Sequence, residues 1–299
     1  MKYIAELPFA AIRDPQAWTA GRSLTEWAVA VEAAGFDAVA VTDHPFPSDA
    51  WLSNGGRHAF DPFVILTAFG VATSTIRLIS DVLVAGYRNP YLVAKSMASV
   101  DQLTNGRLTL GIAAGYQRAE FDALGASFED RGGRFDEAIS AITAALSGQS
   151  VHSDGPHYPA HGHTALPRPT QLPRPPIWVG GNAPAALRRA VRLADGWMPF
   201  HQSTHRVAIS LAPSLESLEE LAPRIATAQA QRADLGLAPL EICVSIFQHP
   251  LAPEDYRALA PVYAEAGVTW IRVMTAASSM ATSIPRLQSI AAALELATA

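Results

Sequence analysis

Two hydrophobic patterns alternate along the whole chain. Short runs rich in β-branched residues, typical of buried strands, are each followed by a longer segment in which apolar residues recur at helical spacing. Strands that alternate with helices favour a parallel sheet with crossover helices. The pattern predicts eight strands, at residues 3–7, 38–42, 77–84, 108–113, 176–179, 197–199, 241–247 and 268–273.

Capping and turn residues mark the ends of the predicted helices. The first helix is expected to begin at the capping box at 23–26 and to end at Gly35. Proline in the first turn marks the start of several others. The remaining helices are predicted at 62–73, 90–105, 135–148, 183–194, 215–235, 253–266 and 285–296.

No feature of the chain marks a boundary between two domains. Its 299 residues suit a barrel of eight strand–helix units with insertions, and no linker rich in glycine, serine or charge interrupts the alternation. The sequence therefore predicts one α/β domain over residues 1–299, a single (β/α)8 barrel. An insertion at about 116–175, between the fourth and fifth strands, is expected to hold one amphipathic helix and a loop rich in proline, histidine and glycine.

Composition and charge exclude several classes of protein. With 49% hydrophobic and 16% charged residues, the chain can bury a large core. The net charge is -5 without a basic stripe, so nucleic acid is not an expected partner. The single cysteine, Cys243, cannot form an internal disulfide. Because no segment approaches the roughly 18 apolar residues of a membrane span and no signal peptide begins the chain, we expect a cytoplasmic protein that does not enter a membrane.

Polar residues end the second predicted strand. In a (β/α)8 barrel the chemistry gathers at the carboxyl ends of the strands, where Asp43 and His44 stand side by side before Pro45. Such a pair can hold a proton donor or acceptor near neutral pH. The alternative is that Asp43 caps a loop amide and His44 only packs.

A polar pair, Ser80 and Asp81, interrupts the third strand, where a parallel strand should be buried on both faces. Either Asp81 points into the barrel mouth or it is a buried acid paired with an arginine. Arg77 lies too near the other end of the strand to be that partner.

Small residues follow the fourth and fifth strands. Gly111 to Gly115, before Tyr116, would let a flat ligand approach the backbone, although they do not form a dinucleotide-binding fingerprint. After the fifth strand comes Val179-Gly180-Gly181-Asn182, with Asn182 as the expected N-cap and Pro184 in the first helical turn. Free amides there form an anion site, and an ordinary strand-to-helix turn is the alternative.

Four histidines crowd the insertion, at His152, His157, His161 and His163. They suggest a metal cluster, but solvated loop residues are the favoured interpretation, because no fixed spacing, cysteine or carboxylate completes a ligand set. No metal is therefore expected. Serine hydrolase and P-loop motifs are absent from the sequence.

Taken together, these motifs resemble the bacterial luciferase-like superfamily, specifically its branch of oxidoreductases that use the deazaflavin coenzyme F420. The resemblance covers nearly the whole chain. It is carried by Asp43-His44, Asp61-Pro62-Phe63, Ile76-Arg77-Leu78, Tyr87-Arg88-Asn89-Pro90, Asp101-Gln102-Leu103-Thr104-Asn105-Gly106-Arg107, Leu110-Gly111, Gly115-Tyr116 with Glu120-Phe121, and Pro176-Ile177-Trp178-Val179-Gly180-Gly181 with Ala194-Asp195-Gly196-Trp197.

The resemblance implies a barrel whose mouth holds a flavin-like ring. A non-prolyl cis peptide, here Asp81–Val82, would back the ring, and His44 would lie beside it as the candidate for proton transfer. The residues it implies as cofactor-binding are Asp43, His44, Asp81, Val82, Ala114, Gly115, Tyr116, Val179, Gly180, Gly181 and Asn182. The sugar-phosphate dehydrogenase branch has an acid where this chain has Tyr116, so glucose-6-phosphate oxidation is not expected. An apolar, aromatic substrate cavity would instead be lined by Phe46, Trp51, Tyr116 and Phe200.

The expected function is hydride transfer between bound F420 and a small, apolar or aromatic organic substrate, in a homo-oligomer such as a dimer. Three alternatives remain open from the residues. The barrel could bind FMN as a luciferase-like monooxygenase, bind a ligand without turnover, or act as a metal-dependent hydrolase built on the loop histidines.

Overall fold

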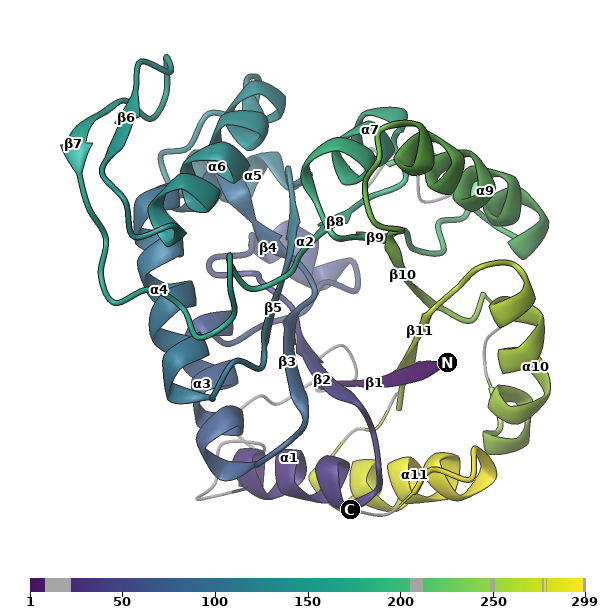
Figure 1. The fold of residues 1–299 in the computed structure, drawn as a ribbon. Coiled ribbons are helices and arrows are strands. Elements are labelled where there is room, and N and C mark those ends of the chain that lie inside the picture. The colour runs from purple at the N-terminus through teal and green to yellow at the C-terminus, as the bar shows by residue number, and fades with distance from the viewer. Residues whose placement is uncertain (9–22, 205–211, 248–250, 276, 278, 298–299) are drawn as a thin grey trace.

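Eight parallel strand positions close into a barrel surrounded by helices (Figure 1). The computed structural model describes residues 1–8, 23–204, 212–247, 251–275, 277 and 279–297. The barrel strands are β1 (Lys2–Glu6), β2 (Ala38–Val41), β3 (Arg77–Ser80) continued by β4 (Leu83–Val84), β5 (Leu108–Ala113), β8 (Ile177–Gly180), β9 (Gly196–Met198), β10 (Glu241–Ser245) and β11 (Trp270–Met274). The ring closes because β1 pairs with both β2 and β11 and because β3 and β4 both pair with β5. The predicted (β/α)8 barrel is confirmed.

A layer of long helices packs around the strands. These helices are α1 (Ser23–Ala33), α3 (Pro62–Ala72), α4 (Pro90–Leu103), α6 (Arg131–Leu146), α7 (Pro184–Leu193), α9 (Leu218–Asp234), α10 (Pro253–Glu265) and α11 (Met280–Ala293). The last helix was predicted to begin at Pro285, and this is wrong. It begins after Ser279, whose hydroxyl accepts the Thr282 amide, and Pro285 lies within it. The cap at Ser279, rather than the proline, sets the start of the helix.

The barrel interior is filled by large side chains from some strands and small ones from others. Trp178 and Trp270 cross at 5.3 Å between ring centroids. Gly196 on β9 leaves room for the Trp178 ring, because a Cβ there would lie 2.5 Å from it, and Gly111 on β5 leaves room for the neighbouring strand, because a Cβ there would lie 2.1 Å from the Ser80 carbonyl oxygen. The interior is therefore a packed core, as in other barrels of this type. Its apolar members are Ile4, Ala38, Ala40, Ile79, Trp178, Met198, Cys243 and Trp270.

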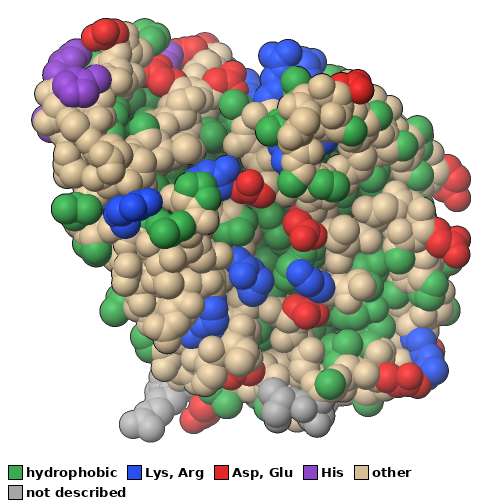
Figure 2. Space-filling model, viewed as in Figure 1, with side chains coloured by type: hydrophobic (Ala, Val, Ile, Leu, Met, Phe, Trp, Pro, Cys, Tyr) green, Lys and Arg blue, Asp and Glu red, His purple; other side chains and the backbone are tan. Residues whose placement is uncertain are grey.

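The insertion between β5 and β8 contains more structure than the sequence pattern predicted. Besides α6, it holds α5 (Arg118–Ala123) and an antiparallel hairpin of β6 (Val151–Ser153) and β7 (Ala160–His163). The hairpin projects from the barrel beside α6 (Figure 1), and histidines gather on it in Figure 2. Expecting a single helix and a loop here was wrong, because strands of three and four residues are too short to show an alternating pattern.

At the amino ends of the strands, buried charges bind backbone oxygens. Arg107, just before β5, donates to the carbonyls of Gly70, Thr73, Ile76 and Thr104. These acceptors belong to the end of α3, the end of α4 and the connection to β3, so one guanidinium ties several segments together. Lys, Arg, Asp and Glu side chains appear over the centre of the face shown in Figure 2.

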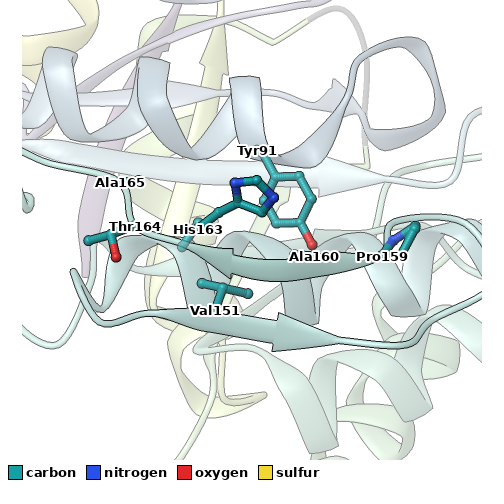
Figure 3. Close-up of a pocket in the computed structure, with 8 residues that line it drawn as sticks. Tyr91, Val151, Pro159, Ala160, His163, Thr164 and Ala165 are labelled. Carbon is teal, nitrogen blue, oxygen red and sulfur yellow. The ribbon is translucent and has the colours of Figure 1, made fainter.

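A pocket of about 340 Å³ lies outside the barrel, under the hairpin (Figure 3). The Tyr91 hydroxyl, at its edge, donates to the Tyr158 carbonyl at 2.7 Å. None of the residues that line the pocket is among the predicted site residues. They are Tyr91, Ala145, Val151, Pro159, Ala160, His163, Thr164 and Ala165. No helix in the described part of the chain is long and apolar enough to cross a membrane.

Candidate active site

His44 lies directly beyond β2, at the carboxyl end of the barrel, and is 7% exposed. Its Nδ1 is 3.2 Å from Oε2 of Glu120. The Trp51 ring, from the short helix α2 (Asp49–Ser53), lies 4.4 Å from the imidazole between centroids, and the Tyr116 ring meets it edge-on at 6.4 Å. The imidazole is therefore enclosed by two aromatic rings and one carboxylate.

Glu120 is almost fully buried, with 1% of its surface exposed. Its Oε1 accepts the Phe46 amide at 2.9 Å, and its Oε2 accepts the Tyr87 hydroxyl at 2.9 Å. Burial alone would raise the pKa of the Glu120 carboxyl, but the hydrogen bonds from His44, Phe46 and Tyr87 hold that pKa below its ordinary value. Glu120 is consequently a carboxylate at neutral pH and an acceptor of hydrogen bonds.

The neighbouring residue, Phe121, explains why α5 docks where it does. Its ring packs 4.7 Å from Tyr87 and 5.4 Å from Phe128, between centroids. Two glycines make room for it, since a Cβ on Gly86 or Gly115 would lie 2.6 Å and 2.7 Å, respectively, from Phe121 atoms. Phe121 thus anchors α5 against the segment after β4, and the carboxylate beside it meets His44.

Asp43 forms a separate network. Both of its oxygens accept from Arg88, at 2.7 and 3.0 Å, and one also accepts the Val84 amide at 3.0 Å. Arg88 reaches on to Asp61 at 3.0 Å. The interpretation of Asp43 as the cap of a loop amide therefore describes its contacts, whereas His44 is held by an acid from elsewhere in the chain. A direct contact of Asp43 with a cofactor stays a prediction.

The third barrel strand breaks at Asp81–Val82, and this peptide bond is cis as expected. Asp81 forms an ion pair with Arg272 on β11, so it is the buried acid paired with an arginine. Arg272 also donates to the Ser245 hydroxyl at 3.1 Å. Burial raises the pKa of the nearby Glu6 carboxyl, and the charge of Arg272 opposes that shift. Opposite charges from Asp81, Arg272 and Glu6 are thus placed near one another at the carboxyl ends of the strands.

The turn after β8 differs from its predicted form in two respects, because its cap is another residue and because the Gly181 amide is not free but donates to the Met198 carbonyl. Asn182 is not the N-cap of α7: that position is Ala183, which has no side-chain oxygen to accept the amides of the first turn. The Asn182 side chain instead donates to the carbonyls of Phe200 and Pro213 and accepts the Phe200 amide at 3.0 Å. It holds the segment after β9, which sequence spacing does not reveal.

Glycines shape the same turn. Gly181 has φ +119°, which favours glycine, and its amide donates to the Met198 carbonyl at 3.1 Å. A Cβ on Gly180 would lie 3.0 Å from a methyl group of Val82. The segment after β3 and the turn after β8 therefore pack closely at Gly180, where a side chain would require Val82 to shift. Val179 lies buried on β8 just before them.

Two sets of the predicted site residues come together. His44, Trp51 and Tyr116 come together around one imidazole, and Val82 meets Gly180 at the β8 turn. Phe46 is 65% exposed and lies at the rim. Phe200 is held through its backbone by Asn182, and Ala114 and Gly115 continue from β5 toward Tyr116.

Two residues of the site had no assigned role from the sequence, Glu120 and Tyr87. The signal that could have found both is that they stand in motifs that carry the family resemblance, Gly115-Tyr116 with Glu120-Phe121 and Tyr87-Arg88-Asn89-Pro90. Tyr87 lies in the 3-10 turn Ala85–Tyr87, and nothing in its spacing pointed to an acid 33 residues away.

The insertion histidines do not form a metal site within the described residues, where no group of three metal-binding side chains is found. His157 pairs with Asp130 at 3.0 Å, and His161 lies 3.8 Å from Asp154. The hydrolase alternative therefore has no support from the described part of the chain.

Relatives of known sequence match part of the chain. An uncharacterized protein of Mycobacterium tuberculosis is 36% identical over 183 residues, which cover 57% of this chain and 62% of that protein. An F420-dependent glucose-6-phosphate dehydrogenase of Beutenbergia cavernae is 37% identical over 183 residues, 60% of this chain and 52% of the relative. The match thus spans about half the length of these dehydrogenases.

Solved structures match over nearly the full length. A monooxygenase of Streptomyces bottropensis has a TM-score of 0.81 at 21% identity, covering 99% of both chains. An F420-dependent secondary alcohol dehydrogenase in complex with an F420–acetone adduct has a TM-score of 0.71 at 16% identity, covering 98% of this chain and 99% of that one. At these identities the likeness establishes the fold. The model of the luciferase-like monooxygenase family matches residues 7–250, and the chain belongs to that family.

Proposed function

We propose that the protein is an oxidoreductase that transfers a hydride between coenzyme F420 and a small organic substrate at the carboxyl end of the barrel. The observation that carries this proposal is the His44 imidazole, backed by the buried Glu120 carboxylate and flanked by Trp51 and Tyr116. Relatives and a structural neighbour named for their dependence on F420 support the choice of cofactor.

The β8 turn and the first turn of α7 suit the phosphate of the cofactor. Ala183 leaves the amides of that turn without a side-chain acceptor, and the helix dipole favours an anion there. The glycines before it keep the approach open, because a side chain on Gly180 would fill the space against Val82. Residues that would line the ring are Asp43, Asp81, Val82, Ala114, Gly115 and Tyr116.

When bound, F420 supplies the centre that accepts or releases a hydride, and the protein supplies position and proton transfer. His44 is the residue we assign to the proton, because an imidazole can both accept and donate a proton and this one stands at the mouth of the barrel. Its aromatic neighbours restrict water around the ring. Ion pairs at the carboxyl ends of the strands, such as that of Asp81 with Arg272, hold their charges in fixed places.

The substrate we propose is small and apolar or aromatic. Tyr116 stands where the sugar-phosphate dehydrogenase branch carries an acid, and Trp51 presents a second aromatic ring beside His44. Phe46 at the rim and Phe200 after β9 would complete such a cavity. The Glu120 carboxylate beside these rings is occupied by hydrogen bonds from His44, Phe46 and Tyr87.

Titration of the purified protein with F420 and, separately, with FMN tests the cofactor assignment. Binding can be followed through tryptophan fluorescence, since Trp51 lies beside His44. We expect F420 to bind saturably at one site per chain and FMN to bind far more weakly. Tight binding of FMN with no binding of F420 would replace this proposal by the monooxygenase alternative, and binding of neither would remove both.

We also propose that the chain forms a homodimer through the outer face of α3 and α4. Val64 and Val71 on α3 are 70% and 65% exposed, and Leu92 and Leu103 on α4 are 68% and 61% exposed. Because α3 and α4 are in contact, exposed apolar side chains on these two helices favour an interface there. Sedimentation velocity should show a dimer that Val71→Lys converts to a monomer, and a monomeric wild-type protein would contradict this assignment.

A further inference from the structure

The Glu120 carboxylate joins three separate segments of the chain around His44. It accepts the Phe46 amide from the loop after β2, the Tyr87 hydroxyl from the turn after β4, and it lies 3.2 Å from the His44 Nδ1. Oε1 accepts the Phe46 amide, and Oε2 accepts the Tyr87 hydroxyl and faces the His44 Nδ1. Each oxygen therefore has its own hydrogen-bond partners, and the carboxylate cannot rotate without losing one of these hydrogen bonds.

This arrangement determines which ring nitrogen carries the proton in neutral His44. An ionised carboxylate can only accept, so the nitrogen that faces it must donate. Nδ1 is that nitrogen, and the neutral imidazole then has its lone pair on Nε2. Hydrogen bonds among the described residues engage the ring through Nδ1.

The ring is also held against rotation by its neighbours. Trp51 lies across it with an interplanar angle of 39°, and the edge contact with Tyr116 is at 84°. With Nδ1 bound to Glu120, Nε2 occupies the opposite side of the imidazole. The aromatic contacts thus fix the direction of the Nε2 lone pair, and the hydrogen bond to Glu120 keeps Nε2 unprotonated in the neutral imidazole.

We propose that Glu120 is a positioning residue that holds His44 in the Nδ1–H tautomer, so that Nε2 is the atom that exchanges the proton of the reaction. This rests on the proposed function, in which a hydride leaves a substrate carbon with both electrons of its C–H bond and goes to F420. The O–H or N–H bond on the same carbon would break as the hydride leaves, its electron pair would form the new C=O or C=N π bond, and its proton would move to Nε2, where Glu120 balances the imidazolium charge. In the opposite direction Nε2 returns the proton.

A single substitution should reverse the tautomer. In Glu120→Gln the amide oxygen remains the acceptor for the Phe46 N–H, which places the new NH2 group at the position of Oε2. That group donates to Nδ1, and the imidazole proton moves to Nε2. The same exchange behind the imidazole of a catalytic triad lowers turnover about 10⁴-fold through the wrong tautomer, and we expect a loss of about two to four orders of magnitude here.

Tyr87→Phe is the matched control. It removes a different hydrogen bond to the same Oε2 atom but leaves the carboxylate acceptor in place. If Glu120 served packing alone, the two variants would affect His44 alike. We expect instead that Tyr87→Phe keeps the Nδ1–H tautomer and Glu120→Gln does not.

The test is nitrogen NMR of protein labelled at its histidine rings, at a pH where the imidazoles are neutral, with His44→Gln for assignment. We expect Nδ1–H in the wild type and in Tyr87→Phe, and Nε2–H in Glu120→Gln. A wild-type His44 protonated at Nε2, or the same tautomer in both variants, would overturn the inference. The wild-type spectrum alone decides it if Glu120→Gln fails to fold.

The spectrum needs neither cofactor nor substrate, so the two proposals fail separately. Failure of F420 to bind would remove the proposed function while the tautomer result stood. An Nε2–H tautomer in a protein that binds F420 would remove the role of Glu120 and leave the cofactor assignment in place.

Discussion

The two ends of the barrel use buried charge in different ways. At the amino ends of the strands, Arg107 donates to four backbone carbonyls, and Arg77 donates to the Leu108 carbonyl and the Thr109 hydroxyl. At the carboxyl ends, side chains bind one another: His44 with Glu120, Asp43 with Arg88, and Asp81 with Arg272.

The difference separates structural from chemical use of the same residue types. A guanidinium bound to carbonyls has partners that cannot change charge, so it ties segments together permanently. An imidazole bound to a carboxylate through one nitrogen can still gain or lose a proton at the other. Chemistry is therefore expected where acids and bases meet each other, and stability where they meet the backbone.

His44→Ala should have the largest effect, and that effect should be on turnover alone. If Nε2 transfers the proton, hydride transfer falls by about two to four orders of magnitude, while F420 still binds. The measurement is single-turnover hydride transfer with the variant saturated in F420 and a substrate that the wild type converts. A rate near that of the wild type would remove the acid–base role of His44.

Arg107→Met should act at the opposite end and on stability. Its removal leaves four carbonyls without their donor, and we expect the free energy of unfolding to fall by about 3–5 kcal/mol. Urea unfolding measures this. The exposed pair of Arg257 and Glu295 offers a control, since Arg257→Met should cost about 0–1 kcal/mol. Equal losses from both variants would show that the Arg107 contacts do not stabilise the fold.

The sequence predicted the barrel and most strand ends because those features repeat with a short period. It did not identify Glu120 as the partner of His44, because that contact requires Phe121 to dock over Gly86 and Gly115. The partner of Asp81 was equally hidden, since Arg272 lies 191 residues away. Long-range pairs depend on the register of closed strands, which hydrophobic pattern alone does not reveal.

The charge of Glu120 should make part of the stability depend on pH. Its folded-state pKa lies below its ordinary value, so its contribution is complete above that value and is lost as the pH falls through the folded-state pKa. Wild type and Glu120→Gln should differ by about 1–3 kcal/mol in unfolding free energy at pH 7 and converge in acid. Urea unfolding across pH tests this, with the exposed Glu265→Gln as a control. A difference that does not change with pH would contradict an ionised Glu120.

The most direct test of the central claim, that the carboxyl end of the barrel holds the cofactor, is an F420 titration of Ala183→Asp beside Ala183→Asn. Both side chains can cap the first turn of α7, but only Asp repels a phosphate there. We predict that Asp weakens F420 binding about tenfold or more and that Asn binds far more tightly than Asp. Equal affinity in the two variants would contradict a cofactor phosphate at this turn.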